Sequence, residues 1–451
     1  MDLSLYEIAR IVDAKNDIRT YADSTVNKIE FDSRLIGEGD LFLPLRGSRD
    51  GHDFIETAIK NGAVATFSEK PLEVPHILVA DCLEAFQKLA AAYLEKTGVA
   101  VIAVTGSNGK TTTKDMLAHI LSTTYQVYKT QGNYNNDIGL PYTVLHMPEG
   151  TEKLVLEMGQ DHLGDIHRLS LLVRPAVGIV TMIGEAHLAF FKNTSEIAKG
   201  KMQLADGMPD GGLLVVPDDP LISDYIPENQ EIIFVGKDIY LTDLHEAKDS
   251  LTFTASFMED AVSLPVTGAY NATNALIAAY VAKRLGITEE AIITSLANLT
   301  LTVNRTQWYR TNNGVDILSD VYNANPTAMR LVLETFSAIP REKGGRKVAL
   351  LADMKELGET SVARHSQMIT SLSPDTLDEV ICYGEDIAEL AQLASQVFPV
   401  GHVYFFSKNE TVDQMPEMLA HLKETLGAND QLLLKGSHSM GLARILEQWD
   451  M

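Results

Sequence analysis

The chain has 451 residues, of which 45% are hydrophobic and 22% charged, which is typical of a globular protein with about two to four domains. Its formal net charge of −24 disfavours nucleic acid or an anionic membrane as the main partner, because either would need clustered lysines and arginines. The two cysteines, Cys82 and Cys382, show no metal spacing and no disulfide framework, and the N-terminus lacks the apolar run of a signal peptide. No apolar stretch approaches membrane-spanning length. We therefore expect a cytoplasmic protein without membrane insertion.

Residues 1–81 are predicted to form a small α/β unit. A short amphipathic helix comes first, and strands are expected at Ala63–Phe67 and His76–Val79. Two polar clusters adjoin apolar strands, one at Asp32–Arg34 and one at Arg46–His52. Each cluster can be interpreted as a solvated turn or as an anion or diphosphate site made from serine hydroxyls, arginines and loop amides.

The stretch Val101–Lys114 (VIAVTGSNGKTTTK) follows an amphipathic helix predicted at Leu83–Lys96, and we place the first domain boundary near residue 82. The stretch combines a buried strand, a loop with glycines and the start of a helix. Glycines let backbone N–H groups approach phosphate oxygens, and a helix N-terminus adds unpaired donors and partial positive charge. In such a cradle Lys110 reaches the terminal phosphates and the Thr111 hydroxyl ligates Mg²⁺.

This loop departs from the general phosphate-loop pattern, because Val104 stands where that pattern has its first glycine. The strand before the loop and the helix after it still favour nucleotide binding. An ordinary strand-to-helix turn would not account for Lys110 and Thr111 occurring together.

Beyond this loop, apolar strands alternate with helical patterns, which predicts mostly parallel sheets with helices on both faces. The first such region has strands at Leu154–Glu157, Gly178–Ile183 and Leu213–Val216, and the segment Ile232–Pro265 is expected to be an antiparallel appendage. A second doubly wound domain starts at residue 311. Its strands are predicted at Val315–Ser319, Lys347–Ala352, Asp378–Tyr383, His402–Phe406 and Gln431–Leu434. Ligands of such sheets gather at the carboxyl ends of the strands.

Three residues near these strand ends have different prospects as metal ligands. Glu157 ends an apolar strand, and a buried acid needs a cation or hydrogen-bond donors, so its carboxylate suits Mg²⁺. His187 follows the next strand, but histidine is an uncommon ligand of Mg²⁺, and a loop histidine is the alternative. From chemistry alone, Lys201 is interpreted as a surface lysine on a helix.

Several other polar residues could contact a ligand, although helix capping or surface exposure is the alternative for each of them. An amide-rich loop, GNYNNDIG, contains Asn133, Asn135 and Asn136 and could bind a polar substrate. Arg305 could reach a γ-phosphate. The remaining candidates lie at the start of a helix or at the end of a strand: Asn271, Asn274, Asp320, Asn323, Asn325, His365, Lys435, Gly436 and Ser437.

Taken together, these segments resemble the Mur ligases, ATP-dependent amide-forming enzymes of peptidoglycan synthesis. The resemblance covers nearly the whole chain and rests on a series of segments in this order: FDSRLIGEGDLFLPLRG, TGSNGKTTTK, GNYNNDIGLP, LEMG, IGEAHL, AKGKM, YNATNALIAAY, NRTQW, DVYNANPTAM, LADMKELGE and LLKGSHSM. The family's short phosphate loop accounts for Val104. GNYNND and DVYNANPTAM are similar to the members that add D-Ala-D-Ala to UDP-N-acetylmuramoyl-tripeptide.

The resemblance implies an α/β fold of three domains. They are a small N-terminal UDP-binding domain at 1–81, a central P-loop ATPase domain at 82–310, and a C-terminal Rossmann-like domain at 311–451 that closes over ATP and D-Ala-D-Ala. The resemblance also implies ATP and two Mg²⁺ ions, a carbamylated lysine, the two small-molecule substrates UDP-N-acetylmuramoyl-tripeptide and D-Ala-D-Ala, and a monomer.

Site residues follow from the same resemblance, position by position. The implied catalytic residues are Lys110, Glu157, His187, Lys201 and Arg305, and the metal ligands are Thr111, Glu157, His187 and, if carbamylated, Lys201. ATP is expected at Thr105, Gly106, Ser107, Asn108, Gly109, Lys110, Thr111, Thr112, Asn274, Arg305 and Asp320. The other substrates are expected at Ser33, Arg34, Arg46, Gly47, Asp50, Gly51, His52, Asn133, Asn135, Asn136, Asn325, Lys435 and Ser437.

Three alternatives stay open at this point. One is another Mur ligase, and a second is a folylpolyglutamate-type ligase, which shares the ATPase and C-terminal domains but lacks the N-terminal UDP module. The third is a P-loop ATPase that hydrolyses ATP to change shape and uses no carboxylate substrate.

Overall fold

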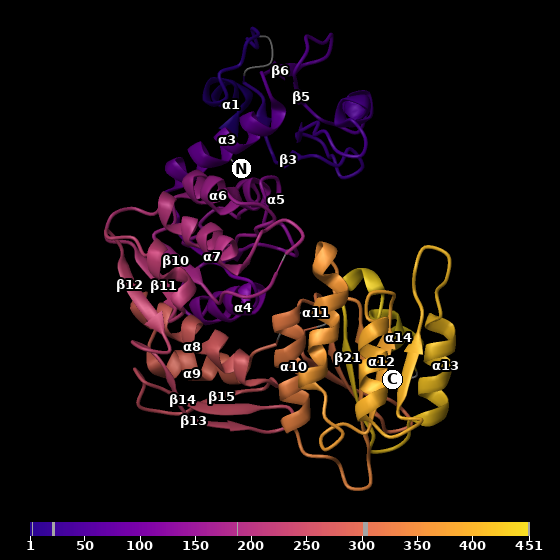
Figure 1. Cartoon of the computed structure of the whole chain (residues 1–451). Helices are drawn as coiled ribbons and strands as arrows, with labels where there is room; N and C mark the ends of the chain where they lie inside the picture. The colour runs from indigo at the N-terminus through magenta and orange to yellow at the C-terminus, as the bar shows by residue number, and fades with distance from the viewer. Residues whose placement is uncertain (2, 20–22, 187, 301–304, 450–451) are drawn as a thin grey trace.

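The computed structural model describes residues 1, 3–19, 23–186, 188–300 and 305–449. In Figure 1 the N-terminal unit stands above the central part, and the C-terminal part lies to the right of the central part. In the part of the chain so described, no helix is both long enough and apolar enough to cross a membrane.

The N-terminal unit is built on a small parallel sheet of four strands in the order β3-β4-β5-β6. These strands are β3 (Ile29–Glu30), β4 (Leu41–Phe42), β5 (Ala65–Ser68) and β6 (His76–Leu78), and an antiparallel pair, β1 (Leu3–Ser4) and β2 (Thr25–Val26), precedes them. The helical segments are α1 (Leu5–Ile11), the 3₁₀ turn η1 (Gly51–Phe54) and α2 (Ile55–Lys60). Ser4 begins α1 through a capping box with Glu7, so the predicted first helix is confirmed.

Helix α3 (Cys82–Thr97) joins this unit to the central part. Asp81 accepts a hydrogen bond from the Glu84 backbone N–H at its start, and Gly98 ends it in the left-handed conformation. The buried face of α3, including Phe86, belongs to one hydrophobic cluster that also contains Phe67 of the N-terminal unit and Leu154 of the central sheet. The hydrophobic core is therefore continuous across the boundary expected near residue 82.

The central sheet has six parallel strands in the order β12-β11-β10-β7-β9-β8. They are β7 (Ala100–Thr105), β8 (Val127–Lys129), β9 (Lys153–Glu157), β10 (Val177–Val180), β11 (Leu213–Pro217) and β12 (Glu231–Val235). Along β7, Val101 and Ala103 face one hydrophobic cluster while Ile102 and Val104 face another, so both faces of the sheet are covered.

The helices divide between these two faces. One face carries α3, α5 (Gly139–Leu145), α6 (Asp165–Val173), α7 (Thr194–Met202) and the turn η2 (Gln203–Gly207). The other carries α4 (Lys110–Leu121), α8 (Ala269–Arg284) and α9 (Glu289–Ala297), and the turn η3 (Pro220–Tyr225) follows β11. A three-stranded antiparallel sheet of β13 (Leu241–Glu246), β14 (Leu251–Ala255) and β15 (Val262–Leu264) packs against α8 and α9 (Figure 1).

Two predictions about this region need correction. The segment Ile232–Pro265 is only partly an antiparallel appendage, because β12 pairs in parallel with β11 as an edge strand of the main sheet. The strand predicted at Gly178–Ile183 ends at Val180. The next residue, Thr181, turns its hydroxyl toward the phosphate loop and donates a hydrogen bond to Asn108 O at 2.5 Å.

The C-terminal sheet has six strands in the order β16-β17-β21-β18-β19-β20, of which only the edge strand β16 is antiparallel to its neighbour. They are β16 (Gln307–Arg310), β17 (Asp316–Asp320), β18 (Lys347–Ala352), β19 (Glu379–Tyr383), β20 (Val403–Phe406) and β21 (Gln431–Lys435). The doubly wound domain is thus confirmed, and β16 extends its sheet to residues before the expected start at 311.

Helices cover both faces of this sheet, which separates two hydrophobic clusters. The α-helices are α10 (Pro326–Ala338), α11 (Ser361–Gln367), α12 (Ala388–Val397), α13 (Met415–Thr425) and α14 (Ala443–Gln448). Short 3₁₀ turns are η4 (Gly358–Thr360), η5 (Met368–Ser371) and η6 (His438–Met440). The mixed α/β class with several mostly parallel sheets is confirmed.

The continuous core predicts that the N-terminal unit and the central sheet are stabilised together. Phe86→Ala should cost about 3–5 kcal/mol and raise the amide exchange rates of both β5 and β9, because Phe86 is fully buried in the cluster that they share. Hydrogen–deuterium exchange followed by mass spectrometry measures this. Phe336→Ala, in the C-terminal core, is the matched control and should leave both strands protected. Loss of protection in β5 alone would show that the two units are stabilised independently.

Candidate active site

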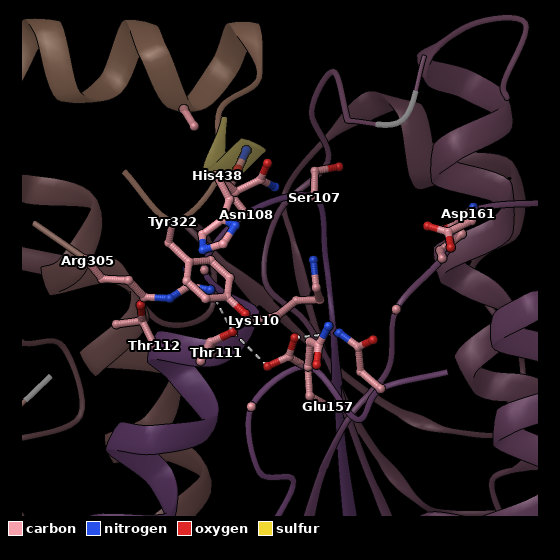
Figure 2. Close-up of a pocket in the computed structure, with 18 of the residues that line it drawn as sticks. Ser107, Asn108, Lys110, Thr111, Thr112, Glu157, Asp161, Arg305, Tyr322 and His438 are labelled. Carbon is pink, nitrogen blue, oxygen red and sulfur yellow. Dashed lines mark hydrogen bonds between the residues drawn. The ribbon is translucent and has the colours of Figure 1, made fainter. Parts of the chain in front are cut away.

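A polar cavity of about 810 Å³ lies between the central and C-terminal parts. It is reached by the phosphate loop, by the loops after β8 and β9, and by helix α8 from the central part (Figure 2). Asp320, Tyr322, Lys435 and His438 line it from the C-terminal part. β7, β9, β17 and β21 direct their carboxyl ends toward this space, as expected for ligand sites in parallel sheets.

The phosphate loop depends on two glycines with backbone conformations that other residues rarely adopt. Gly106 has φ +146° and Gly109 has φ +82°. A Cβ at Gly106 would collide with the Thr181 hydroxyl, and one at Gly109 would collide with the amide of Asn274. The Ser107 hydroxyl donates to Gly184 O at 2.9 Å. The loop is therefore packed against Thr181, Gly184 and Asn274, and the start of α4 stays open to the cavity.

Lys110 lies at the first position of α4, beside the loop. Its ammonium donates to Gly106 O at 2.9 Å, across the space that the loop encircles. Burial lowers the pKa of Lys110 and Arg305 lowers it further, while the Glu157 carboxylate opposes this shift. A phosphate between these cations would replace the Gly106 carbonyl as the partner of Lys110.

Glu157 is the buried acid of the site, with 3% of its surface exposed. One carboxylate oxygen accepts a hydrogen bond from Thr111 Oγ1 at 2.8 Å and the other accepts from Asn135 Nδ2 at 2.9 Å, as the dashed lines in Figure 2 show. The ammonium of Lys114 lies 3.8 Å from the first oxygen. A hydroxyl and a carboxylate side by side form a set of hard oxygen donors that fits Mg²⁺.

Lys114 is a residue of this site that the sequence analysis missed. It lies one helical turn after Lys110, is almost fully buried, and donates to Thr130 O at 2.9 Å. Its position in TTTKD, four residues after Lys110 on the inward face of a helix, was the signal that could have identified it.

Arg305 connects the central part to the C-terminal part of the site. Its guanidinium donates to Thr111 Oγ1 at 3.0 Å, and its Cζ lies 4.2 Å from the ring centroid of Tyr322. Its Nε is buried and has no hydrogen-bond partner among the described residues. Arg364 also joins the two parts, because its guanidinium pairs with the Glu185 carboxylate of the central part at 2.5 Å.

Asn325 also joins the two parts, although it does not line the cavity. Its Nδ2 donates to Asn108 Oδ1 of the phosphate loop at 2.9 Å, while its own Oδ1 accepts from the backbone N–H of Ala328 at 2.8 Å and so caps α10. The predicted capping role and a contact with the nucleotide loop are therefore both present.

Two further candidates lie at and after the end of β21, and only Lys435 lines the cavity. Lys435 is buried and donates to Asp320 Oδ2 at 2.8 Å and to Asn323 O at 2.5 Å, so it fixes the loop after β17. The Ser437 hydroxyl accepts from the backbone N–H of Lys355 at 2.9 Å and lies outside the cavity lining.

The asparagine candidates of the central part take both functional and structural positions. Asn133, Asn135 and Asn136 line the cavity, and Asn136 Oδ1 also accepts from the Gly139 backbone N–H at 2.8 Å, next to α5. Asn274 lines the cavity from α8 and its Oδ1 accepts a hydrogen bond from Thr113 at 3.3 Å.

Lys201 is buried, with 2% of its surface exposed, so the interpretation of it as a surface lysine is wrong. No hydrogen bond or ion pair holds its ammonium within the described ranges. Burial lowers the pKa of Lys201 well below its usual value, and the charge of Lys110 lowers it further, against the opposing effect of Asp161. The preceding residue, Gly200, has no side chain, and the amide of Gln160 occupies the place of its Cβ.

The predicted residues thus divide into two sets around the cavity. Those that line it are Ser107, Asn108, Gly109, Lys110, Thr111, Thr112, Asn133, Asn135, Asn136, Glu157, Asn271, Asn274, Arg305, Asp320, Asn323 and Lys435. Thr105 and Gly106 support the loop from the end of β7, where the Thr105 hydroxyl donates to Met158 O at 2.9 Å. His187 lies outside the described residues.

The N-terminal candidates do not line this cavity. Arg34 pairs with Asp32 at 2.6 Å and holds the pKa of that carboxyl at about 2, and Ser33 is buried beside them. Arg46, Asp50 and His52 are likewise engaged with neighbours of their own unit. A Cβ at Gly47 would meet only the Arg49 carbonyl oxygen, at 4.0 Å, whereas Gly51 approaches the backbone of Leu45 too closely to carry a side chain.

Sequence analysis also missed a group of polar and aromatic residues that line the cavity: Gln160, Asp161, His162, Asp165, Arg168, Tyr270, Tyr322, Glu356 and His438. Several of them directly follow the strand that ends at Glu157, and this position was the signal that could have identified them. Gln160 is the clearest case, because it is 3% exposed and both atoms of its amide have no partner among the described residues.

The phosphate loop gives a direct test of these backbone constraints. Gly109→Ala should destabilise the chain by more than the roughly 1–2 kcal/mol of a left-handed alanine, because the added methyl also collides with Asn274. Gly98→Ala is the matched control, since Gly98 has φ +65° and nothing within 4 Å of a Cβ. Chemical denaturation compares the two variants. Equal losses would mean that Asn274 does not constrain the loop.

Three family models match the chain in succession: "Mur ligase family, catalytic domain" at residues 25–122, "Mur ligase middle domain" at 104–282 and "Mur ligase, glutamate ligase domain" at 304–438. The UDP-N-acetylmuramoyl-tripeptide–D-alanyl-D-alanine ligase of Bacillus subtilis is 36% identical over 95% of this chain and 94% of its own length. The ligase of the same name from Escherichia coli is 30% identical, with 97% of each chain covered.

Solved structures give the same result at the level of the fold. A crystal structure of MurF from Acinetobacter baumannii matches with a TM-score of 0.90 and 26% identity, covering 99% of this chain and 98% of that one. MurF ligase from Thermotoga maritima in complex with ADP matches with a TM-score of 0.82 and 29% identity over 93% and 96% of the two chains. The described fold, the phosphate-loop site and these similarities agree, and the chain belongs to the Mur ligase family.

Proposed function

We propose that this chain joins D-Ala-D-Ala to UDP-N-acetylmuramoyl-tripeptide, with conversion of ATP to ADP and phosphate, in peptidoglycan synthesis. The observation that carries the proposal is the convergence of Lys110, Thr111, Glu157 and Arg305 on one cavity between two α/β parts. The names of its relatives at 30–36% identity over nearly the whole chain support the same reaction.

The chemistry explains why such an enzyme needs ATP. A carboxylate is a poor acceptor, because its charge repels nucleophiles and oxide is a poor leaving group. In the proposed first step an oxygen of the tripeptide carboxylate attacks the γ-phosphorus, the bond to the bridging oxygen breaks, and ADP leaves. The amine of D-Ala-D-Ala then attacks the acyl carbon and loses a proton, and phosphate leaves as the amide forms.

The residues at the phosphate loop suit the first of these steps. Backbone N–H groups of the loop at 106–111 bind the phosphates, and Lys110 and Arg305 offset the charge that spreads over the transferring phosphoryl oxygens. The contact between Arg305 and Thr111 supports a role for this arginine at the terminal phosphate. Asn274 and Asp320, which line the same cavity, are proposed to contact the adenosine part.

Mg²⁺ fits the donors at this site, since Thr111 Oγ1 and the Glu157 carboxylate lie 2.8 Å apart in buried surroundings with hard oxygen atoms. When bound, it would neutralise phosphate charge and polarise the phosphoryl group. For a second ion we propose Glu157 with His187 and a carbamylated Lys201. A carbamate forms on a neutral amine, and Lys201, with its lowered pKa and no partner among the described residues, is suited to that modification.

The remaining substrates are assigned to the other polar clusters. We propose that the UDP moiety binds the N-terminal unit at 1–81, at Ser33, Arg34 and the loop Arg46–His52, and that D-Ala-D-Ala binds near Asn325, Lys435 and Ser437. The central domain, at 82–310, and the C-terminal domain, at 311–451, would close around the reacting groups. Closure supplies effective molarity, roughly 7–11 kcal/mol in well-oriented models, and excludes water from the acyl phosphate.

The proposal includes a cytoplasmic monomer. A folylpolyglutamate-type ligase is the weaker candidate. The folylpolyglutamate synthase of Mycobacterium tuberculosis matches 82% of this chain with a TM-score of 0.63 and 14% identity, which is a similarity of fold alone.

Phosphate release with each substrate omitted in turn tests the proposed reaction. Release should require ATP, UDP-N-acetylmuramoyl-tripeptide and D-Ala-D-Ala together, because the γ-phosphoryl group is transferred to a carboxylate and leaves when the amine attacks. A colorimetric phosphate assay, with mass spectrometry of the product, makes the measurement. Full ATPase activity with neither of the other substrates would favour a switch ATPase and count against ligation.

The proposed role of Lys201 gives a second prediction. Lys201→Ala should be nearly inactive, because the oxygen ligand supplied by a carbamate is lost, and added short carboxylic acids should restore part of the activity by occupying the vacated space. The matched control is Lys199→Ala, on the same helix. Activity of Lys201→Ala equal to that of the unaltered chain would remove this role.

A further inference from the structure

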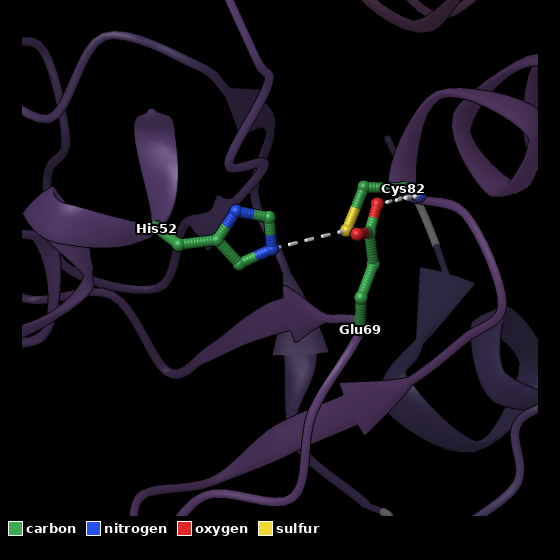
Figure 3. Close-up of side chains that lie close together, drawn as sticks. All are labelled: His52, Glu69 and Cys82. Carbon is green, nitrogen blue, oxygen red and sulfur yellow. Dashed lines mark hydrogen bonds between the residues drawn. The ribbon is translucent and has the colours of Figure 1, made fainter. Parts of the chain in front are cut away.

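A second group of metal-binding side chains lies in the N-terminal unit, away from the cavity described above. It consists of His52, Glu69 and Cys82, and we refer to it as the HEC cluster. One ligand atom from each residue lies within 4.8 Å of the others. Figure 3 shows the imidazole, the carboxylate and the thiol directed toward one another from three separate segments of the chain.

The imidazole of His52 is oriented by a neighbouring acid. Its Nδ1 lies 2.6 Å from Asp50 Oδ1, and the same carboxylate oxygen accepts the backbone N–H of His52 at 3.0 Å. A carboxylate at Nδ1 keeps the proton on that nitrogen, so the lone pair is left on Nε2, which faces Cys82 Sγ at 4.0 Å. Carboxylate–histidine pairs of this kind orient the ligands of many zinc sites.

Cys82 provides the sulfur of the cluster from the first turn of α3, and 2% of its surface is exposed. Burial, together with the charges of Glu69 and Asp81, raises the pKa of the thiol to about 12, so without a metal it keeps its proton. The contact with His52 at 4.0 Å is at the limit for a sulfur hydrogen bond and is weak. A hydrogen bond from the thiol to His52 therefore contributes little to holding the three side chains together.

Glu69 completes the set and is held by two groups. Arg46 pairs with its Oε2, while Oε1 accepts the backbone N–H of Cys82 at 3.3 Å. The Glu69 carboxylate lies beside the thiol and across from the imidazole (Figure 3). A divalent ion bound to a thiolate and this carboxylate would have its charge balanced.

We propose that the HEC cluster binds a zinc-like divalent cation through Cys82 Sγ, His52 Nε2 and a carboxylate oxygen of Glu69, with a fourth position open to water or a ligand. Zinc–sulfur and zinc–nitrogen bonds of about 2.3 and 2.0 Å in a tetrahedral site set these two atoms roughly 3.5 Å apart, close to the 4.0 Å observed. A thiolate and an imidazole select a borderline-soft cation over Mg²⁺. Binding forms the metal–sulfur bond and releases the thiol proton to solvent.

The cluster shares His52 with the loop proposed to bind the UDP moiety, and its test uses neither nucleotide nor substrate, so it is decided independently of the proposed reaction. The full chain, freed of metal with a chelator, is titrated with Co²⁺ as a spectroscopic probe. One equivalent should produce absorption from thiolate-to-cobalt charge transfer and the visible bands of tetrahedral cobalt. Zn²⁺ should abolish these bands and a large excess of Mg²⁺ should not.

Variants assign the signal to the cluster. Cys82→Ser should remove the charge-transfer absorption, whereas Cys382→Ser, which alters a buried cysteine of the C-terminal core, should retain it. Asp50→Asn should weaken Zn²⁺ binding by about 10- to 100-fold, because it removes the group that orients His52. Charge-transfer absorption that persists in Cys82→Ser, or disappears in Cys382→Ser, would overturn the proposal.

Proton release gives a measurement on the unaltered chain, which does not depend on the folding of any variant. Calorimetric titration with Zn²⁺ in two buffers of different ionisation enthalpy should show about one proton released for each ion bound, because the thiol is protonated beforehand. Zinc binding without proton release, or no binding at all, would show that Cys82 is not a ligand and would overturn the proposal.

Discussion

The buried carboxylate of Glu157 is the constraint around which the described site is arranged. An isolated charge in such surroundings is costly, and this one is compensated by a hydroxyl, an amide and the ammonium of Lys114. The hydroxyl and the ammonium come from α4 and the amide comes from the loop after β8, so the requirement to satisfy one carboxylate fixes the start of α4 against that loop. The same carboxylate would receive a divalent cation when nucleotide arrives.

The two α/β parts meet at the nucleotide loop as well as at contacts farther from it, such as that of Arg364 with Glu185. Arg305 bonds Thr111, and Asn325 bonds Asn108, so both contacts end on the phosphate loop itself. A change in what this loop binds would therefore reach the C-terminal part through two direct hydrogen bonds. This arrangement is suited to a reaction that gathers three substrates, because closure and phosphate binding would depend on the same atoms.

Much of the fold could be predicted from the sequence, because buried strands such as 101–104 are continuous apolar runs and the glycines of the phosphate loop stand at fixed spacing. The edge strand β12 could not be assigned, because its short apolar run does not show whether it pairs in parallel or antiparallel, and only its neighbour β11 decides the pairing. The burial of Lys201 could not be predicted from the sequence pattern either. A lysine within a helix gives no indication of which face carries it inward until the sheet beneath is known.

The three residues of the HEC cluster could not be predicted as a site from the sequence. Cys82 has no metal spacing in the sequence, yet folding of the N-terminal unit brings it beside His52 and Glu69. Ligands gathered from separate elements leave no motif, and the geometry alone identifies them. The candidates Asn136 and Lys435, in contrast, line the cavity, and each also holds a neighbouring segment through hydrogen bonds.

The central claim is that the loop at 106–111 holds the phosphates whose terminal group is transferred. A crystal structure of the chain with Mg²⁺ and a non-hydrolysable ATP analogue tests it most directly. The account predicts the β- and γ-phosphates on the backbone N–H groups of this loop, with Lys110 moved from Gly106 O to a phosphate oxygen and the metal ion in contact with Thr111 Oγ1. A triphosphate bound elsewhere, with Lys110 still on Gly106, would contradict it.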